Sequence, residues 1–206
     1  MKRLAILGAS GHGKVVADTA EACGWQNVLF FDDAWPTLQT NGPWSVVGTT
    51  ADLFNRLDEF AGVIVAIGSN TTRYAKLLEL VASDAPLITL VHPHAVVSRH
   101  ALLEVGSVVF AGAVINAGTV IGRGAIINTG SSVDHDCRLG EAVHVSPGAR
   151  LAGGVVVGDR SWIGIGATVR QLIRIGSDVT VGASSGVVCD VPGNLIVVGV
   201  PARTLR

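Results

Sequence analysis

The sequence has no apolar run near the roughly 20 residues that a helix needs to span a bilayer, although hydrophobic residues make up 49% of its 206 residues. The apolar stretch at its start, in "MKRLAILGASGHGK", is only a few residues long. It runs into a glycine-rich loop instead of a small-residue cleavage site. We therefore expect a globular protein with no membrane span and no export signal.

The sequence also has no excess of charge of either sign, and it has few cysteines. The 15 basic residues nearly balance the 16 acidic ones, and no cluster of Lys or Arg forms a stripe that would follow a phosphate backbone. The sequence therefore predicts no nucleic-acid partner. The cysteines, Cys23, Cys137 and Cys189, are odd in number and widely spaced, which favours reduced thiols in a cytoplasmic protein over a disulfide framework.

The first part of the chain alternates between strand and helix patterns. Strand patterns occur in "RLAIL", "NVLFFDD" and "GVIVAIGSN", and helix patterns occur in "GHGKVVADTAEACG" and "TTRYAKLLELVAS". Such alternation predicts parallel strands with crossover helices. The segment is too short for a complete dinucleotide-binding fold, so we predict a half-sized, Rossmann-like α/β domain over residues 1–92.

Beyond about residue 95 the helix patterns end and a repeat of six residues begins. Sixteen consecutive positions, six residues apart, hold only Val, Ile or Leu: Val97, Leu103, Val109, Ile115, Ile121, Ile127, Val133, Leu139, Val145, Leu151, Val157, Ile163, Val169, Ile175, Val181 and Val187. Hexapeptide repeats are typical of a parallel β-helix, whereas a β-sandwich would show period two. We predict such a helix over residues 93–206, with about eighteen residues per coil and about five coils. The period does not fix its handedness.

One stretch of the repeat carries candidate catalytic residues. If eighteen residues return the chain to the same place one coil higher, His135 and Asp136 lie below Gly153 and Gly154 and above Ala117 and Gly118. Glycines would then clear space around an imidazole, whose neighbouring carboxylate can orient it as a general base. A bare backbone N–H beside it could stabilise an oxyanion. Outside this setting, a surface His beside an Asp usually has no such function.

A zinc site is the main chemical alternative. It would need histidines converging from adjacent faces of neighbouring chains, with one pair five residues apart and another two coils apart. The candidates His92, His94, His100, His135 and His144 do not show these spacings. We therefore expect no metal.

The "GASGHGK" loop follows a strand and opens a helix, so its backbone amides form a potential phosphate site. Its spacing, Gly8, Gly11 and Gly13, departs from the G-x-G-x-x-G pattern and weakens a nicotinamide interpretation. Acidic and polar residues end the following strands, where they could contact a ribose or base. These candidates are Asp32, Asp33, Gly68, Ser69 and Asn70, with Arg73 in the next helix and His12 in the loop. Each of these turns could also be purely structural.

Together, "GASGHGK", "FFDD", "AIGSN", "INTGSSVDHDCRLGEAVHVSPGARLAGGVVVG" and the C-terminal "VVGVPARTLR" resemble the sialic-acid O-acetyltransferase family and its nucleotide-sugar N-acetyltransferase members. The resemblance covers essentially the whole chain. It implies a left-handed β-helix, a homotrimer with active sites between subunits, acetyl-CoA in the groove between neighbouring prisms, and a nucleotide sugar held by the N-terminal domain.

The resemblance also implies roles for individual residues. His135 would be the general base and Asp136 its acidic partner. The implied sugar-nucleotide site comprises Gly8, Ser10, His12, Gly13, Asp32, Asp33, Gly68, Asn70, Arg73 and Asn128. The implied acetyl-CoA site comprises His144, Gly153, Ile165 and Ala183. Relatives often carry Glu where this chain has Asp134 and Asp136.

The leading hypothesis is an acetyl-CoA-dependent N-acetyltransferase that modifies the 4-amino group of a UDP-linked 4-amino-4,6-dideoxy sugar by direct transfer. Cys137 occupies a small inward position of the repeat and is expected to pack rather than to react. Two alternatives stay open. One is O-acetylation of a sialic acid or another sugar, and the other is a non-catalytic trimer that binds nucleotide sugars. GDP in place of UDP is also compatible with the sequence.

Overall fold

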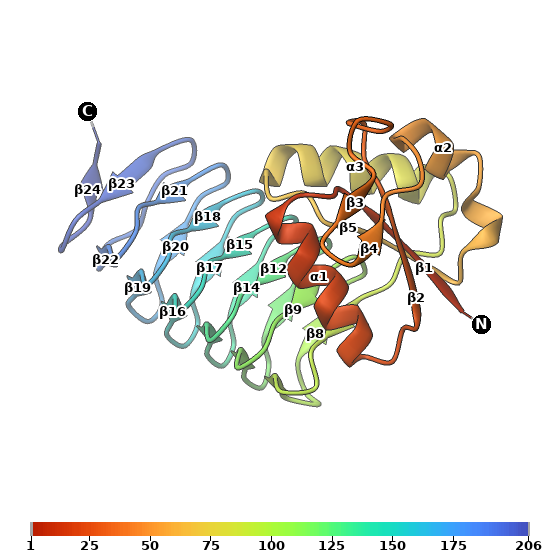
Figure 1. Cartoon of the computed structure of the whole chain (residues 1–206). Helices are drawn as coiled ribbons and strands as arrows, with labels where there is room; N and C mark the ends of the chain where they lie inside the picture. The colour runs from red at the N-terminus through yellow and green to blue at the C-terminus, as the bar shows by residue number, and fades with distance from the viewer. Residues whose placement is uncertain (1, 206) are drawn as a thin grey trace. The chain divides into compact units, whose positions relative to one another are not determined.

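The computed structural model describes residues 2–205 and divides the chain into two compact units, with the boundary between Pro93 and His94 (Figure 1). The sequence placed this boundary one residue earlier. No helix within residues 2–205 has the length and apolar character that crossing a membrane requires.

The first unit is built on a parallel sheet in the order β2-β1-β5, where β1 is Arg3–Leu7, β2 is Asn27–Phe31 and β5 is Gly62–Val65. Side chains alternate between the two faces of this sheet, as strand geometry requires. On one face Ala5 and Leu7 form a core with Leu53 and Leu80, which come from helices α2 (Thr50–Phe54) and α3 (Asn70–Ala82). Helix α1 (Gly11–Ala22) packs on the sheet as well. The predicted α/β domain is therefore confirmed.

Several short elements were not predicted from the sequence. They are the hairpin of β3 (Thr40–Asn41) and β4 (Trp44–Ser45), helix α2, the 3-10 turn η1 (Leu57–Glu59) and strand β6 (Leu90–Val91). Helix α2 is too short to show a helical period, but it carries a capping box. Thr49 Oγ1 accepts a hydrogen bond from the Asp52 amide, and Asp52 Oδ2 accepts one from the Thr49 amide.

The second unit is a parallel β-helix of two-residue strands (green to blue in Figure 1). Its first sheet contains β7 (Val96–Val97), β10 (Val114–Ile115), β13 (Ser132–Val133), β16 (Arg150–Leu151), β19 (Thr168–Val169) and β22 (Gly186–Val187). Its second sheet contains β8 (Leu102–Leu103), β11 (Val120–Ile121), β14 (Arg138–Leu139), β17 (Val156–Val157) and β20 (Arg174–Ile175). Its third sheet contains β9 (Val108–Val109), β12 (Ile126–Ile127), β15 (His144–Val145), β18 (Trp162–Ile163), β21 (Thr180–Val181), β23 (Ile196–Val198) and β24 (Arg203–Thr204).

The predicted period is confirmed by the strand register. Val114 pairs with Ser132, and Ser132 pairs with Arg150, so each coil advances the chain by eighteen residues. Each of the sixteen residues of the apolar repeat is the second residue of a strand from β7 to β22. These side chains form one continuous core, because each coil covers the apolar residues of the coil below it.

Small residues between the apolar ones fill the interior, and several of them carry buried hydroxyls. Ser107, Thr119 and Ser161 are fully buried and donate to backbone carbonyls at the same corner of the helix, one coil above. These bonds satisfy polar groups that burial would otherwise make costly. Cys137 holds an equivalent position, and burial raises the pKa of its thiol.

Candidate active site

A histidine–aspartate pair lies at the corner between β13 and β14. The imidazole Nδ1 of His135 is 2.8 Å from Oδ2 of Asp136. Because a carboxylate only accepts hydrogen bonds, this contact places the proton on Nδ1 and leaves the lone pair on Nε2. The two side chains are 63% and 72% exposed, so Nε2 is open to a ligand.

Glycines make room for both side chains, as the stacking arithmetic predicts. A Cβ on Gly153, one coil above, would lie 2.5 Å from His135 Nε2. A Cβ on Gly118, one coil below, would lie 2.5 Å from Asp136 Oδ1. The amide of Gly154 donates to the His135 carbonyl, whereas the amide of Gly153 has no backbone acceptor within residues 2–205. Gly153 is buried, and its amide keeps an unused donor in the lining of the cavity beside His135.

The space around the imidazole is less empty than predicted. The side chain of Leu172, two coils above Asp136, would come within 2.7 Å of a Cβ on Gly154. Together with Gln171 it bounds a cavity of about 280 Å³ beside His135 and Gly153, which we call the His135 cavity.

Asp134, the residue before His135, accepts a hydrogen bond from the His135 backbone. Its Oδ1 accepts hydrogen bonds from the His135 amide and from Asn116 Nδ2, both at 2.8 Å. These bonds lower the pKa of the Asp134 carboxyl, with the Asn116 bond as the largest cause. The hydrogen bond to Asp136 and the negative charge of Asp134 in turn raise the pKa of His135. Both effects favour proton uptake by the imidazole, which a general base requires.

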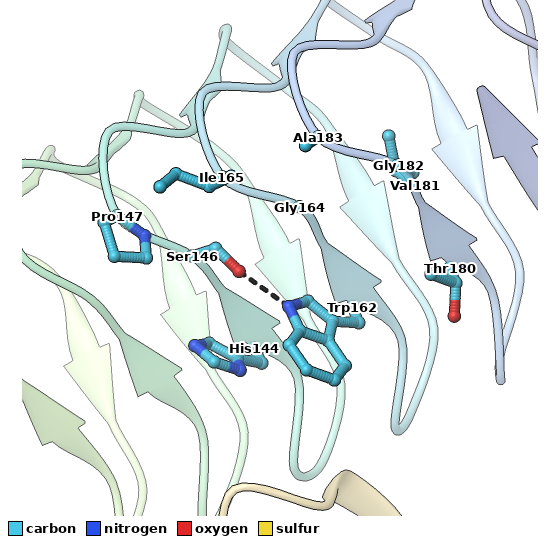
Figure 2. A pocket seen from close by; sticks show the side chains of 10 residues that line it. All are labelled: His144, Ser146, Pro147, Trp162, Gly164, Ile165, Thr180, Val181, Gly182 and Ala183. Atoms are coloured by element: carbon cyan, nitrogen blue, oxygen red, sulfur yellow. Dashed lines mark hydrogen bonds between the residues drawn. The ribbon is translucent and has the colours of Figure 1, made fainter. Parts of the chain in front are cut away.

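A second cavity, of about 400 Å³, opens along the third sheet and its corner with the first sheet (Figure 2). We call it the Trp162 cavity. Its lining residues are His144, Ser146, Pro147, Trp162, Gly164, Ile165, Thr180, Val181, Gly182 and Ala183. The Trp162 indole stacks on the His144 ring at 5.1 Å between centroids and donates from Nε1 to Ser146 Oγ at 2.6 Å. An apolar groove with a fixed aromatic wall suits an extended, partly apolar ligand.

Three of the residues predicted for the acetyl-CoA site line the Trp162 cavity: His144, Ile165 and Ala183. Gly153 does not, because it lies at the different corner that carries His135. Asn128, which was predicted for the sugar-nucleotide site, lies near His144 and not near His135. Its Nδ2 lies 3.1 Å from His144 Nε2, so it supports the ring that forms part of the cavity wall.

A third cavity, of about 280 Å³, lies within the first unit at the carboxyl ends of β1, β2 and β5. We call it the Asp32 pocket. Of the residues predicted for the sugar nucleotide, Gly8, Ser10, Asp32, Asp33 and Gly68 line it. Sequence reasoning missed Thr50, Thr72 and Lys76, which also line it. Lys76 lies one helical turn beyond Arg73 on α3, and this spacing is the signal that could have indicated it.

Backbone amides donate hydrogen bonds to both acidic side chains of this pocket. Asp32 accepts from the amides of Ala9 and Ala34, at 2.8 and 2.9 Å. Asp33 accepts from the Thr50 amide at 2.8 Å, and this bond is the largest cause of the lowered pKa of its carboxyl. The lowered pKa keeps the Asp33 carboxyl ionised, and both side chains retain lone pairs for a ligand.

The other predicted residues of the first unit lie outside the pocket lining. Gly13 permits close packing, because a Cβ there would lie 2.4 Å from the Gly8 carbonyl oxygen. Burial, with the charge of Arg73 second, lowers the pKa of His12 to about 4. Asn70 and Arg73 are buried and bond to each other, with Arg73 Nη2 donating to Asn70 Oδ1 at 2.9 Å. The predicted direct contact of these four residues with substrate is therefore not visible in the pocket lining.

Metal ligands do not gather at any of these sites. Within residues 2–205, no group of three or more His, Cys, Asp or Glu side chains is arranged to hold a metal ion.

The class of protein follows from three features: coils with a period of eighteen, an exposed His–Asp pair beside a glycine, and an apolar groove. Together they define a hexapeptide-repeat acyltransferase. Comparisons with known proteins agree. Residues 3–79 match the family model of the PglD N-terminal domain. The acetyltransferase domain of PglB from Neisseria gonorrhoeae FA1090, solved in complex with acetyl coenzyme A, is 43% identical. It matches with a TM-score of 0.95 over 99% of each chain.

Two curated relatives have named activities. GDP-perosamine N-acetyltransferase of Escherichia coli O157:H7 is 30% identical over all of this chain and 97% of its own length. UDP-N-acetylbacillosamine N-acetyltransferase of Bacillus subtilis (strain 168) is 36% identical over 52% of this chain and 50% of its own length. The chain therefore belongs to the PglD-type family of sugar N-acetyltransferases. The expected left-handed β-helix and the acetyltransferase class are confirmed.

Proposed function

We propose that the protein transfers the acetyl group of acetyl-CoA to the 4-amino group of a nucleotide-linked 4-amino-4,6-dideoxy sugar, with UDP as the first nucleotide to test. The observation that carries this proposal is the His135–Asp136 pair, held 2.8 Å apart with Nε2 facing Gly153. Relatives named as N-acetyltransferases of GDP-perosamine and of UDP-N-acetylbacillosamine support the substrate class.

In the proposed reaction, His135 is the general base. The neutral amine nitrogen of the sugar attacks the thioester carbonyl carbon, and Nε2 takes a proton from that nitrogen. Asp136 stabilises the resulting imidazolium through Nδ1. The Gly153 amide donates to the oxyanion of the tetrahedral intermediate. Cleavage of the C–S bond then releases the CoA thiolate, which takes up the proton held by Nε2 and restores the neutral imidazole.

Direct transfer fits the surroundings of His135 better than an acyl-enzyme does. Cys137 is the nearest thiol along the chain, but it points into the core with its Sγ 3.3 Å from the Ala152 carbonyl oxygen. Burial raises its pKa, which disfavours the thiolate that a covalent mechanism would need.

The acetyl-CoA is proposed to bind in the Trp162 cavity, and the diphosphate of the sugar nucleotide in the Asp32 pocket. The Trp162 cavity and His135 lie at different corners of the same prism, separated by the first sheet. A donor in that cavity would therefore serve the His135 of another copy. This separation supports a homotrimer with active sites between subunits, in which exposed Leu172 and Ile165 become covered.

The test is a thiol-release assay with acetyl-CoA and three acceptors: UDP-linked and GDP-linked 4-amino-4,6-dideoxy sugars, and free sialic acid. We expect CoA release with a nucleotide amino sugar, loss of activity in His135→Ala, and normal activity in His100→Ala. His100 is an exposed histidine at the same corner, two coils below, and serves as the matched control. CoA release only with sialic acid would establish O-acetylation instead. Nucleotide-sugar binding without CoA release would establish a non-catalytic binding protein.

A further inference from the structure

Arg73 in helix α3 is a buried cation of the first unit. It is 1% exposed, and burial lowers its pKa to about 9, so it stays protonated at neutral pH. Its Nη1 donates to the carbonyl oxygens of Ile67 and Gly68, at 3.0 and 3.1 Å. Burying a charge is costly unless it is well hydrogen-bonded, so these bonds tie the loop between β5 and α3 firmly to the helix.

The direction of these bonds also determines where the backbone N–H groups of the loop point. In a trans peptide the C=O of one residue and the N–H of the next point in opposite directions. Because the carbonyls of Ile67 and Gly68 face Arg73, the N–H groups of Gly68 and Ser69 face away from it. Ile67 and Gly68 both line the Asp32 pocket. Neither the Gly68 nor the Ser69 amide has an acceptor within residues 2–205.

We propose that Arg73 is a positioning residue, which orients the Ile67–Ser69 backbone so that the amides of Gly68 and Ser69 bind the diphosphate of the sugar nucleotide. Arg73 does not touch the ligand itself. This inference rests on the proposed function, because it takes the Asp32 pocket as the nucleotide site.

The charges of the pocket are consistent with this assignment. Asp32 and Asp33 make one wall negative, with Lys76 near Asp33 offsetting part of that charge, so an anionic diphosphate is favoured at the opposite wall. That wall is the Ile67–Ser69 loop, with Arg73 behind it. His12, buried beside Arg73, is neutral because its pKa is lowered to about 4, so the positive charge there comes from the guanidinium.

Calorimetric binding of UDP and GDP, with acetyl-CoA binding measured in parallel, tests the proposal. In Arg73→Lys and Arg73→Met, the nucleotide that wild type binds more tightly should bind at least about tenfold more weakly. Methionine donates no hydrogen bond, and the single nitrogen of lysine cannot replace both Nη1, which holds the two carbonyls, and Nη2, which holds Asn70. Acetyl-CoA affinity should not change. Leu77→Ala is the matched control, because Leu77 is buried on the same helix and its loss destabilises the unit without touching the loop.

A second variant keeps the test decisive if the Arg73 variants do not fold. A Cβ on Gly68 would meet no atom within 4 Å, so Gly68→Ala should fold normally. Its methyl group would enter the space of the diphosphate, and we expect at least about tenfold weaker nucleotide binding.

Three results would overturn the proposal: unchanged nucleotide affinity in Arg73→Lys or Gly68→Ala, an equal loss in Leu77→Ala, or no binding of either nucleotide to the wild-type protein. If the wild-type protein binds nucleotide as described but transfers no acetyl group, the proposed function is refuted and the positioning role of Arg73 stands.

Discussion

Replacing Gly153 by Ala should disable the general base without unfolding the protein. The new Cβ would lie 2.5 Å from Nε2 and 2.6 Å from Cε1 of His135, where ordinary contacts begin at 3.4 Å. The ring must therefore move by about 1 Å, a displacement that can cost about a hundredfold in rate. Folding should be little affected, because His135 is exposed and free to swing outward and Ala117 already occupies the equivalent corner position two coils below.

Steady-state kinetics measures the predicted loss of rate, and thermal unfolding measures the predicted retention of stability. We expect kcat/KM to fall about a hundredfold, with a melting temperature close to that of wild type. The double variant His135→Ala/Gly153→Ala should be no slower than His135→Ala alone, because the methyl group acts through the ring. If Gly153→Ala lowers the residual rate of the His135→Ala background by the same large factor, the methyl group acts on bound substrate and the reasoning is refuted.

Three further predictions concern the same sites. In Asp136→Asn the acid limb of kcat/KM against pH should shift to lower pH, because the carboxylate that raises the pKa of His135 is gone; an unshifted limb would assign it to another group. Ile165→Glu should raise the KM for acetyl-CoA without altering nucleotide binding by calorimetry, because it puts a charge in the Trp162 cavity. Co-expressed His135→Ala and Ala183→Trp chains should recover about a quarter of wild-type activity by random assortment in a trimer, whereas sites within single subunits would recover none.

The period of six predicted the second unit closely, because each hexapeptide contributes one large apolar residue to the core and each coil covers the coil below it. That relation is local and repetitive, so the register of Val114 with Ser132 follows from counting. The same counting placed Gly153 above His135. It missed the side chain of Leu172, because a leucine at a corner can point in several directions and only packing selects one.

The first unit was less predictable. Its main strands and its two long helices followed from apolar patterns, but helix α2 and the β3–β4 hairpin are too short to show a period. The sequence grouped Arg73 with the residues of the nucleotide site. In the fold Arg73 lies beneath the loop, and Lys76, one turn later, reaches the pocket.

The sequence by itself determined the β-helix, its stacking interval and the pairing of His135 with Asp136, because repeats and neighbours along the chain are written directly in the order of residues. Only the tertiary structure decided that Thr50 and Lys76 share a pocket with Asp32, and that the side chain of Leu172 bounds the His135 cavity. The physical reason is that these arrangements depend on side-chain directions and on packing between distant segments, which no spacing along the chain encodes.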